Sequence, residues 1–224
     1  IAGLCQQAYH HADHFLIRAI LSDEALGRYS IAFRFLSVGI MVAPFATPAA
    51  PPLPRRAPKQ GTLAAQHAPY IRPLTLGAAL ACGLALPWCA EVLTLFGPEF
   101  TAAAPAMRWM LLSCVAIHFG AVHMTSLVAC GRTTLVLRVA FAALLLDLAL
   151  NLSLLPALGI EGAGLARALT ELFVAGCARI ALTRCGVPLR AGAALRCTLA
   201  ACALFLLGAT LSSHLPLEGL FDAF

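Results

Sequence analysis

The chain of 224 residues is strongly apolar: 61% of its residues are hydrophobic, 11% are charged, and its mean hydropathy is +0.87. Ordinary soluble domains carry about 25% charged residues, so this composition excludes an ordinary soluble protein and predicts an integral membrane protein. The formal net charge of +5 comes from basic residues scattered in short connections. No basic patch interleaved with aromatic residues is present, so we expect no nucleic acid partner.

Apolar runs recur along the chain with short connections between them. Because about 20 residues span a hydrocarbon core of about 30 Å, we predict an all-α fold, a polytopic bundle of about seven transmembrane helices. It forms a single membrane domain over residues 1–224, with a six-helix lobe at 1–185 and one additional helix at 190–213. The opening residues lack an initiator Met and the features of a signal peptide, so we expect Ile1 to be an internal position of a longer protein.

The first predicted helix, at residues 4–22, is the least hydrophobic of the set. His10, His14 and Arg18 are spaced four apart and share one helix face, with Asp13 beside them. Two interpretations remain open for this segment. The helix either lines a polar cavity inside the bundle or lies in the membrane interface as an amphipathic helix.

The next stretch alternates turns and apolar helices. An acidic turn is predicted at 22–30, followed by a second helix at 29–47 with Arg34 inside it. A run of prolines then ends this helix, because proline lacks an amide donor and clashes with the preceding turn. After a long connection, a third helix is predicted at 74–96, and the sequence Gly-Pro-Glu-Phe forms the next turn at 97–100.

The fourth predicted helix, at 102–129, carries Arg108, His118 and His123. The two histidines are five residues apart, unlike the four-residue spacing of a helical zinc pair, so we expect no metal site. The nine cysteines contain no Cys-x-x-Cys pair and lie mostly in apolar runs. We expect them to be small buried apolar side chains rather than metal ligands or disulfides.

Residues 133–182 predict a transmembrane hairpin of two long helices. The joining turn is expected at Pro156, Gly159, Gly162 and Gly164. These glycines follow no strand and precede no Lys-Ser/Thr pair, so they do not match a phosphate-binding loop. We expect them to shape the turn and to let two helices approach closely.

Four polar residues interrupt the apolar helices of this hairpin. Asp147 and Asn151 lie four apart on the first helix and therefore share a face. Arg167 and Glu171 repeat this spacing on the second helix, and they form either an ion pair within the helix or a substrate contact. Ionisable groups at membrane depth are costly and mark functional sites by default, which indicates a transporter.

Basic residues gather in alternate connections between the predicted helices. One side of the membrane collects Arg55, Arg56, Lys59, Arg72, Arg132, Arg138, Arg179, Arg184, Arg190 and Arg196. The other side carries mainly Asp and Glu. By the positive-inside rule the basic side is cytoplasmic. We therefore expect a multi-pass protein of the cell inner membrane, with a cytoplasmic N-terminus and a periplasmic C-terminus.

Three segments carry a family resemblance: DHFLIRAILSDEALGRYSIAFRF at 13–35, LTLFGPEFTAAAPAMRWM at 93–110, and ALLLDLALNLSLLPALGIEGAGLARALTE at 143–171. In this order and spacing they resemble the polysaccharide, or lipid-linked oligosaccharide, flippases of the multidrug/oligosaccharidyl-lipid/polysaccharide superfamily. The resemblance implies a transporter of two six-helix lobes with one or two extra helices. This chain would be the second, C-terminal lobe plus one helix, with the N-terminal lobe absent from it.

The resemblance also implies a function and a set of partners. The expected function is translocation of undecaprenyl-pyrophosphate-linked oligosaccharide by alternating access for surface polysaccharide biosynthesis, such as lipopolysaccharide. Expected partners are the lipid-linked oligosaccharide, membrane lipids, the N-terminal lobe, polysaccharide polymerase and glycosyltransferases. No enzymatic activity and no cofactor are expected. The chain departs from the family at Asp147, where Asn is common, and at Arg167, where a small or hydroxyl residue is usual.

Arginine suits a pyrophosphate, because its planar guanidinium binds phosphate oxygens in pairs and stays charged. We expect Arg18 and Arg34 to line the cavity and bind the anionic headgroup, with Arg108 as a further candidate. Asn151 is expected to help position the substrate. The alternative for Arg18 and Arg34 is that each side chain extends to the membrane interface.

Asp13 and Asp147 are the expected acidic residues of the site. They either neutralise arginines in the empty cavity or bind a coupling H⁺ or Na⁺. Asp147 lies near the middle of an apolar helix, and its short side chain cannot extend far toward the interface. It is therefore difficult to explain without a role inside the bundle.

Other functions remain open. A multidrug exporter of the same superfamily would favour aromatic, apolar and acidic cavity linings over several arginines. A membrane enzyme of polysaccharide assembly would need catalytic side chains on a large extramembrane loop, and the long connection carries no paired carboxylates and no Ser/His/Asp set. The last alternative is an orphan half that acts only with another chain or has no function.

Overall fold

The computed structural model describes residues 2–46 and 62–185, and every element in these ranges is a helix. The long helices are α1 (Ala2–Ile20), α2 (Asp23–Ala46), α3 (Thr62–Ala85), α5 (Ala104–Ala129), α6 (Thr133–Leu158) and α7 (Ile160–Arg184). The short ones are η1 (Leu86–Trp88), α4 (Cys89–Thr94) and η2 (Pro98–Ala103). The predicted all-α class is confirmed for this part of the chain, and the predicted helix at 190–213 lies outside the described residues.

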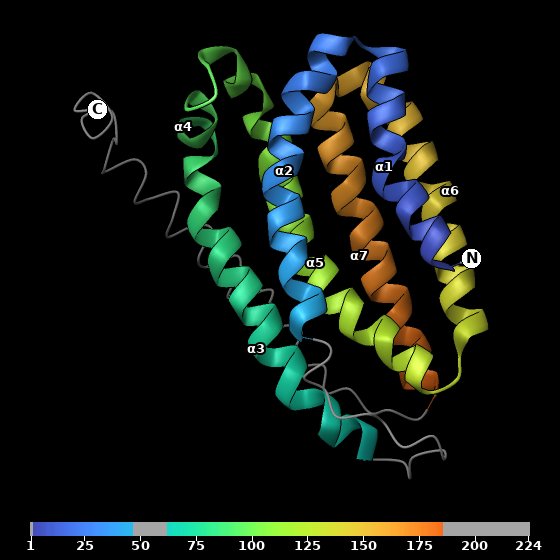
Figure 1. Ribbon diagram of the computed structural model, residues 1–224. Helices are drawn as coiled ribbons and strands as arrows, with labels where there is room; N and C mark the ends of the chain where they lie inside the picture. The colour runs from blue at the N-terminus through green and yellow to red at the C-terminus, as the bar shows by residue number, and fades with distance from the viewer. Residues whose placement is uncertain (1, 47–61, 186–224) are drawn as a thin grey trace.

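The long helices run alongside one another as a bundle (Figure 1). α7 packs against both α5 and α6, while α1 lies along α6. α2 and α3 both pack against α5. Helix α5 is therefore the central element, and α3 lies at one edge of the bundle (Figure 1).

Three segments are long and apolar enough to cross a membrane by length and composition: Pro73–Thr94, Pro98–Ala129 and Thr133–Leu158. The third, which is α6, is the least covered by the rest of the bundle. Its large apolar side chains Phe141, Leu145 and Leu152 are all more than half exposed. These features indicate a multi-pass membrane protein, and the apolar exposed face of α6 is suited to contact with lipid.

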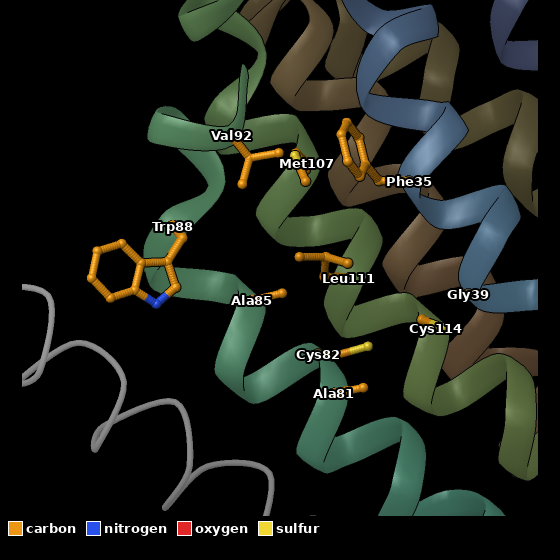
Figure 2. A pocket seen from close by; sticks show the side chains of 10 residues that line it. All are labelled: Phe35, Gly39, Ala81, Cys82, Ala85, Trp88, Val92, Met107, Leu111 and Cys114. Atoms are coloured by element: carbon orange, nitrogen blue, oxygen red, sulfur yellow. The ribbon is translucent and has the colours of Figure 1, made fainter. Parts of the chain in front are cut away.

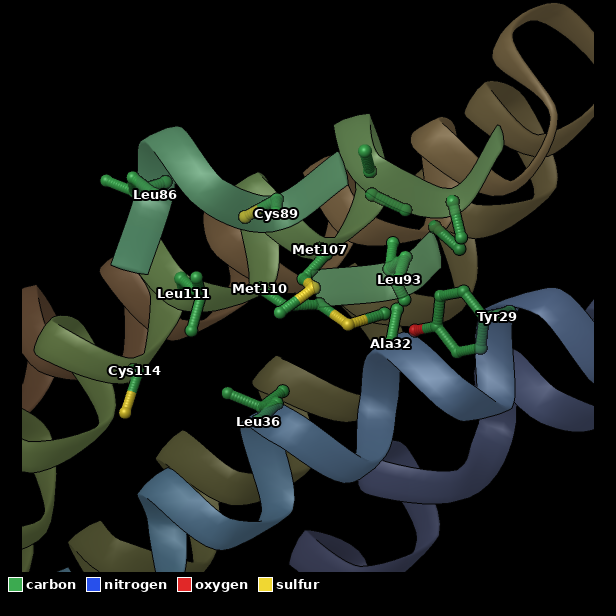
Figure 3. Close-up of a cluster of buried hydrophobic side chains, with 14 of the residues drawn as sticks. Tyr29, Ala32, Leu36, Leu86, Cys89, Leu93, Met107, Met110, Leu111 and Cys114 are labelled. Atoms are coloured by element: carbon green, nitrogen blue, oxygen red, sulfur yellow. The ribbon is translucent and has the colours of Figure 1, made fainter. Parts of the chain in front are cut away.

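An apolar core joins α2, α4 and α5. Leu36 of α2, Leu93 of α4 and Met110 of α5 are fully buried in it (Figure 3). Tyr29 also belongs to this core, and its hydroxyl group bonds to Asp13 of α1. Tyr29 therefore links the apolar core to the polar interior described below.

The start of α2 differs from the predicted acidic turn at 22–30, which was wrong. Helix α2 begins at Asp23, because the amide of Ala25 donates to Ser22 Oγ at 3.1 Å and so satisfies a free donor of the first turn. Asp23 and Glu24 lie in that turn, where carboxylates interact favourably with the helix dipole. The acidic residues that suggested a turn therefore form the first turn of helix α2.

The third predicted helix, 74–96, was wrong at its beginning, whereas its end agrees to within two residues with the candidate span Pro73–Thr94. Helix α3 begins at Thr62 and continues through Pro69 and Pro73. Prolines are tolerated in membrane helices, where neighbouring groups satisfy the freed backbone atoms. At the other end, Pro87 lies in the 3₁₀ turn η1, which separates α3 from the short helix α4.

The hairpin of α6 and α7 turns at a single residue, Gly159, with a φ of 60° that favours glycine. Gly162 and Gly164 lie inside α7, not in the turn. A Cβ atom at Gly162 would lie 2.4 Å from the carbonyl oxygen of Leu154, and one at Gly164 would lie 2.7 Å from that of Ala106. Both glycines therefore permit close approach of helices.

We predict that Gly164→Ala destabilises the bundle by about 1–3 kcal/mol, because the new methyl group meets the backbone of α5. The matched control is Gly176→Ala on the same helix, where an added Cβ has no atom within 4 Å. That control should be neutral or stabilising by up to about 1 kcal/mol. Unfolding free energies measured by denaturant titration in detergent test both, and equal effects would contradict the packing described here.

Candidate functional site

Four charged residues are buried together inside the bundle. Asp13 comes from α1, Asp147 from α6, and Arg167 and Glu171 from α7, and none of them is more than 3% exposed. We call these four residues the charge cluster. Charged side chains are almost never fully buried unless they are paired, so this arrangement is the candidate site.

Asp13 accepts hydrogen bonds from several donors at once. Arg167 Nη2 donates to Oδ2 at 2.7 Å, and the Tyr29 hydroxyl donates to the same oxygen. The backbone amide of His14 donates to Oδ1 at 2.9 Å, and His14 Nδ1 lies 2.9 Å from the same oxygen. Three donors, and a fourth in the tautomer with a proton on His14 Nδ1, match the roughly four acceptor sites of an ionised carboxylate. Asp13 is therefore fully satisfied as an anion.

Arg167 has its charge partner on another helix. The ion pair to Asp13 of α1 joins residues 154 positions apart in the chain. The guanidinium also donates to the backbone oxygen of Tyr9 at 3.4 Å, and it lies within 6 Å of the ring centres of Tyr9 and Phe33. At this distance the aromatic faces stabilise a cation.

Glu171, the residue predicted as a partner for Arg167 within α7, accepts a hydrogen bond from the Tyr9 hydroxyl at 3.3 Å. Tyr9 therefore contacts both members of the predicted pair from α1. Arg167 and Glu171 share one face of α7, as their spacing predicts. Both residues contact side chains or backbone of α1 from that face. On this face Arg167 forms an interhelical ion pair with Asp13.

Asp147 and Asn151 are in contact, as their spacing predicts. Asn151 Nδ2 donates to Asp147 Oδ2 at 3.1 Å and to the Asp147 backbone oxygen at 3.0 Å. Thr170 Oγ1 donates to Asp147 Oδ1 at 3.4 Å. Among the described residues Asn151 Oδ1, which is buried, has no hydrogen-bond partner. The carboxylate of Asp147 thus accepts fewer and longer hydrogen bonds than that of Asp13. The unbonded oxygen Asn151 Oδ1 belongs to the residue that donates to Asp147.

The charge cluster holds one guanidinium for three carboxylates. Leaving a buried charge uncompensated costs several kcal/mol, and such groups usually take up a proton or pair with a cation instead. Asp13 already has Arg167 as its partner. The remaining negative charge belongs to Asp147 and Glu171, where a proton or a small cation would be neutralising.

The other candidate residues lie outside the charge cluster. Arg18 is exposed at the end of α1 and pairs with Asp23 at 2.8 Å across the corner to α2. Arg34 is exposed midway along α2, and Arg108 is exposed near the start of α5. The structure therefore brings together Asp13, Asp147 and Asn151 but not the three arginines.

The sequence pattern did not indicate three residues of the site: Tyr9, Tyr29 and Thr170. Their hydroxyl groups donate to the carboxylates of Glu171, Asp13 and Asp147. One signal was present in the sequence, because Tyr9 and Asp13 lie four apart on one face of α1. The contacts of Tyr29 and Thr170 depend on how separate helices pack.

The histidines of α5 are buried and bonded to their own helix. His118 Nδ1 lies 2.7 Å from the carbonyl oxygen of Cys114, and His123 Nδ1 lies 2.6 Å from that of Phe119. No group of three or more His, Cys, Asp or Glu in the described ranges could hold a metal ion. The two histidines contribute to packing and hydrogen bonding within α5.

An apolar cavity of about 540 Å³ lies between α2, α3 and α5 (Figure 2). Phe35, Trp88 and Met107 are among the side chains that line it. Cys82 and Cys114 also line it, both as free thiols. None of the residues that line the cavity is charged, and none belongs to the charge cluster.

Comparison with known proteins gives no match: no protein-family model, no curated protein and no solved structure resembles the chain closely enough to be related. The described part of the chain is all helical, has three candidate membrane spans and holds a buried charge cluster, which indicates the class of multi-pass membrane proteins.

We predict that Asp13→Asn or Arg167→Met alone destabilises the bundle by about 3–5 kcal/mol, because each leaves a buried charge without its partner. The double variant should recover much of this loss. The exposed pair Arg18 and Asp23 is the control, and breaking it should cost at most about 1 kcal/mol. A double-mutant cycle on unfolding free energies measures both couplings, and a coupling near zero for the buried pair would contradict the site geometry.

Proposed function

We propose that this chain is one lobe of a membrane flippase that moves undecaprenyl-pyrophosphate-linked oligosaccharide across the cell inner membrane by alternating access. The observation that supports it most directly is the exposed Arg34, the twelfth residue of the 24-residue helix α2. α2 packs against α5, a candidate span, and on this proposal Arg34 lies near mid-bilayer depth. A cation at that depth is costly against lipid and usually faces a water-filled cavity.

The exposed face of α2 has the chemistry that an amphipathic substrate requires. Arg34 shares this face with the exposed apolar residues Val38 and Met41 at helical spacing. The guanidinium suits the pyrophosphate linkage, because it binds phosphate oxygens in pairs. A cleft between this face and a second lobe would replace the water that the headgroup loses in crossing the membrane.

Arg18 and Arg108 extend this path toward one end of the bundle. Arg18 lies at the corner between α1 and α2, and Arg108 lies near the start of α5 at the same end (Figure 1). A headgroup that moves from mid-bilayer toward that end would pass from Arg34 to these arginines. Phosphate at Arg18 must first replace the carboxylate of Asp23.

The charge cluster is the proposed site of ion coupling. Asp13 is fully bonded as an anion, whereas Asp147 has two long donor contacts at 3.1 and 3.4 Å. The buried oxygen of Asn151 adds a further acceptor near Asp147. We assign uptake of the coupling H⁺ or Na⁺ to Asp147, with Asn151 as a second ligand of a sodium ion. Asn151 then serves the ion rather than the saccharide.

Uptake of a positive charge at Asp147 would change the balance of forces between α1, α6 and α7. Asp147 and Glu171 share their neighbourhood with the Arg167 and Asp13 pair, which holds α7 against α1. A ligand moves an equilibrium between two conformations only by binding one of them better. An ion that binds Asp147 more tightly in one conformation of the lobe than in the other would therefore drive movement between the two conformations.

The multidrug exporter is the second candidate function, and one observation favours it. The cavity between α2, α3 and α5 is lined by Phe35, Trp88 and other apolar side chains. An exporter of aromatic, apolar compounds would use such a lining. Exposed arginines near mid-depth and at the bundle end favour the anionic, lipid-linked substrate instead.

We predict that Arg34→Gln reduces transport at least about tenfold, because the charge-assisted contacts to phosphate are lost. Arg34→Lys should retain part of the activity. The matched control is Arg28→Gln, which removes an arginine paired with Glu24 at the end of the same helix. Complementation of a flippase-deficient strain by the intact transporter, measured as surface polysaccharide, tests the prediction. Full complementation by Arg34→Gln at equal membrane levels would contradict it.

We predict that Asp147→Asn lowers transport and removes its dependence on the coupling ion, while the protein still inserts into the membrane. The Asn side chain stays neutral and cannot take up a proton in place of the carboxylate, so transport no longer responds to the concentration of H⁺ or Na⁺. Glu99→Gln, which changes an exposed carboxylate in η2, is the control. Transport measured over a range of pH and of sodium concentration tests this. An unchanged ion dependence in the Asp147 variant would exclude it from coupling.

A further inference from the structure

A second pocket lies at the end of the bundle where α6 begins and α7 finishes. Its volume is about 350 Å³, which is within the range of small-molecule sites. Arg132 enters it from the turn before α6, and Arg184 enters it from the last turn of α7. Leu135 and Ile180 form part of its apolar wall. The pocket thus combines two guanidinium groups with an apolar surface.

The positive charge of this pocket is not neutralised by the described part of the chain. Arg132 and Arg184 are both exposed, and the ion pairs of the described residues involve other arginines. The segments around them, 132–139 and 177–185, contain no Asp or Glu. The start of helix α6 adds the partial positive charge of a helix N-terminus. An anion is the complementary ligand.

Charge is distributed unequally between the two ends of the bundle. Within residues 2–46 and 62–185, the carboxylates outside the charge cluster lie on the segments of the opposite end (Figure 1): Asp23, Glu24, Glu91, Glu99 and Glu161. Arg138 and Arg179 lie near the same end as the pocket. Arg18, Arg28 and Arg108 lie at the opposite end, but the alternate-loop distribution of basic residues in the sequence puts the larger number on the pocket side. By the positive-inside rule we take the pocket end as cytoplasmic. The pocket therefore lies at the depth of lipid headgroups on that side.

We propose that this pocket binds the phosphate of an anionic phospholipid, with an acyl chain of the lipid along Leu135 and Ile180. Ile180 is 52% exposed and continues the apolar surface of the bundle. Basic pockets between membrane helices at the cytoplasmic side are suited to such headgroups, and arginine binds phosphate oxygens in pairs. The apolar wall favours a lipid over a free phosphate ion, which has no apolar part.

Lipid titration followed by native mass spectrometry tests this proposal on the delipidated full chain in detergent. Phosphatidylglycerol and phosphatidylcholine with the same acyl chains are compared. We expect wild type to bind phosphatidylglycerol more tightly, and the double variant Arg132→Gln/Arg184→Gln to lose about thirtyfold, from roughly a fivefold to sixfold factor per arginine near a membrane surface. Equal binding of the two lipids, or an unchanged double variant, would overturn the proposal.

Control variants and competition with inorganic phosphate, in the same lipid titration, distinguish binding at this pocket from binding elsewhere. Arg28→Gln at the opposite end is the matched control and should bind phosphatidylglycerol like wild type. Arg132→Lys/Arg184→Lys keeps the charge and should recover at least about tenfold of the lost affinity; no recovery would contradict the electrostatic assignment. Excess inorganic phosphate should displace little lipid, and full displacement would identify a soluble-anion site instead. None of these measurements depends on transport.

Discussion

The ion pair between Arg167 and Asp13 is the interaction on which the packing of this bundle depends. Removing both ions from water costs several kcal/mol each, so the pair is favourable only when further hydrogen bonds satisfy its atoms. Tyr29 and His14 supply those bonds to the carboxylate, and Tyr9 accepts one from the guanidinium. Because these groups come from α1, α2 and α7, one buried pair fixes the relative positions of three helices.

The exposed faces of α6 and α2 differ in polarity, and they therefore suit different surroundings in a membrane. The exposed face of α6 carries Phe141, Leu145 and Leu152 and can lie against lipid. The exposed face of α2 carries Arg34 halfway along the helix, and at the mid-bilayer depth proposed for it a cation needs water or an anion. This asymmetry, together with the negative charge left at Asp147 and Glu171, is the physical basis for proposing a transport lobe rather than a structural bundle.

Local features of the site could be predicted from sequence, and contacts between distant segments could not. The contact of Asp147 with Asn151 follows from their four-residue spacing on α6. The partner of Arg167 is 154 positions away, and finding it requires knowing how α1 packs on α7. Helix positions followed the hydropathy pattern, but the beginning of α3 did not, because its prolines are accommodated within a membrane helix. The beginning of α2 could have been predicted from Ser22, which caps it.

The most direct test of this account is the reaction of single introduced cysteines with a membrane-impermeant maleimide, in the intact transporter with its native cysteines replaced. Arg34→Cys and Val38→Cys report on the exposed face of α2, while Leu145→Cys and Leu152→Cys report on the exposed face of α6. If α2 lines a water-filled cleft, its two cysteines will react and those of α6 will not. If the α2 cysteines are as unreactive as those of α6, that face lies against lipid or packed protein, and the transport lobe proposed here loses its cleft.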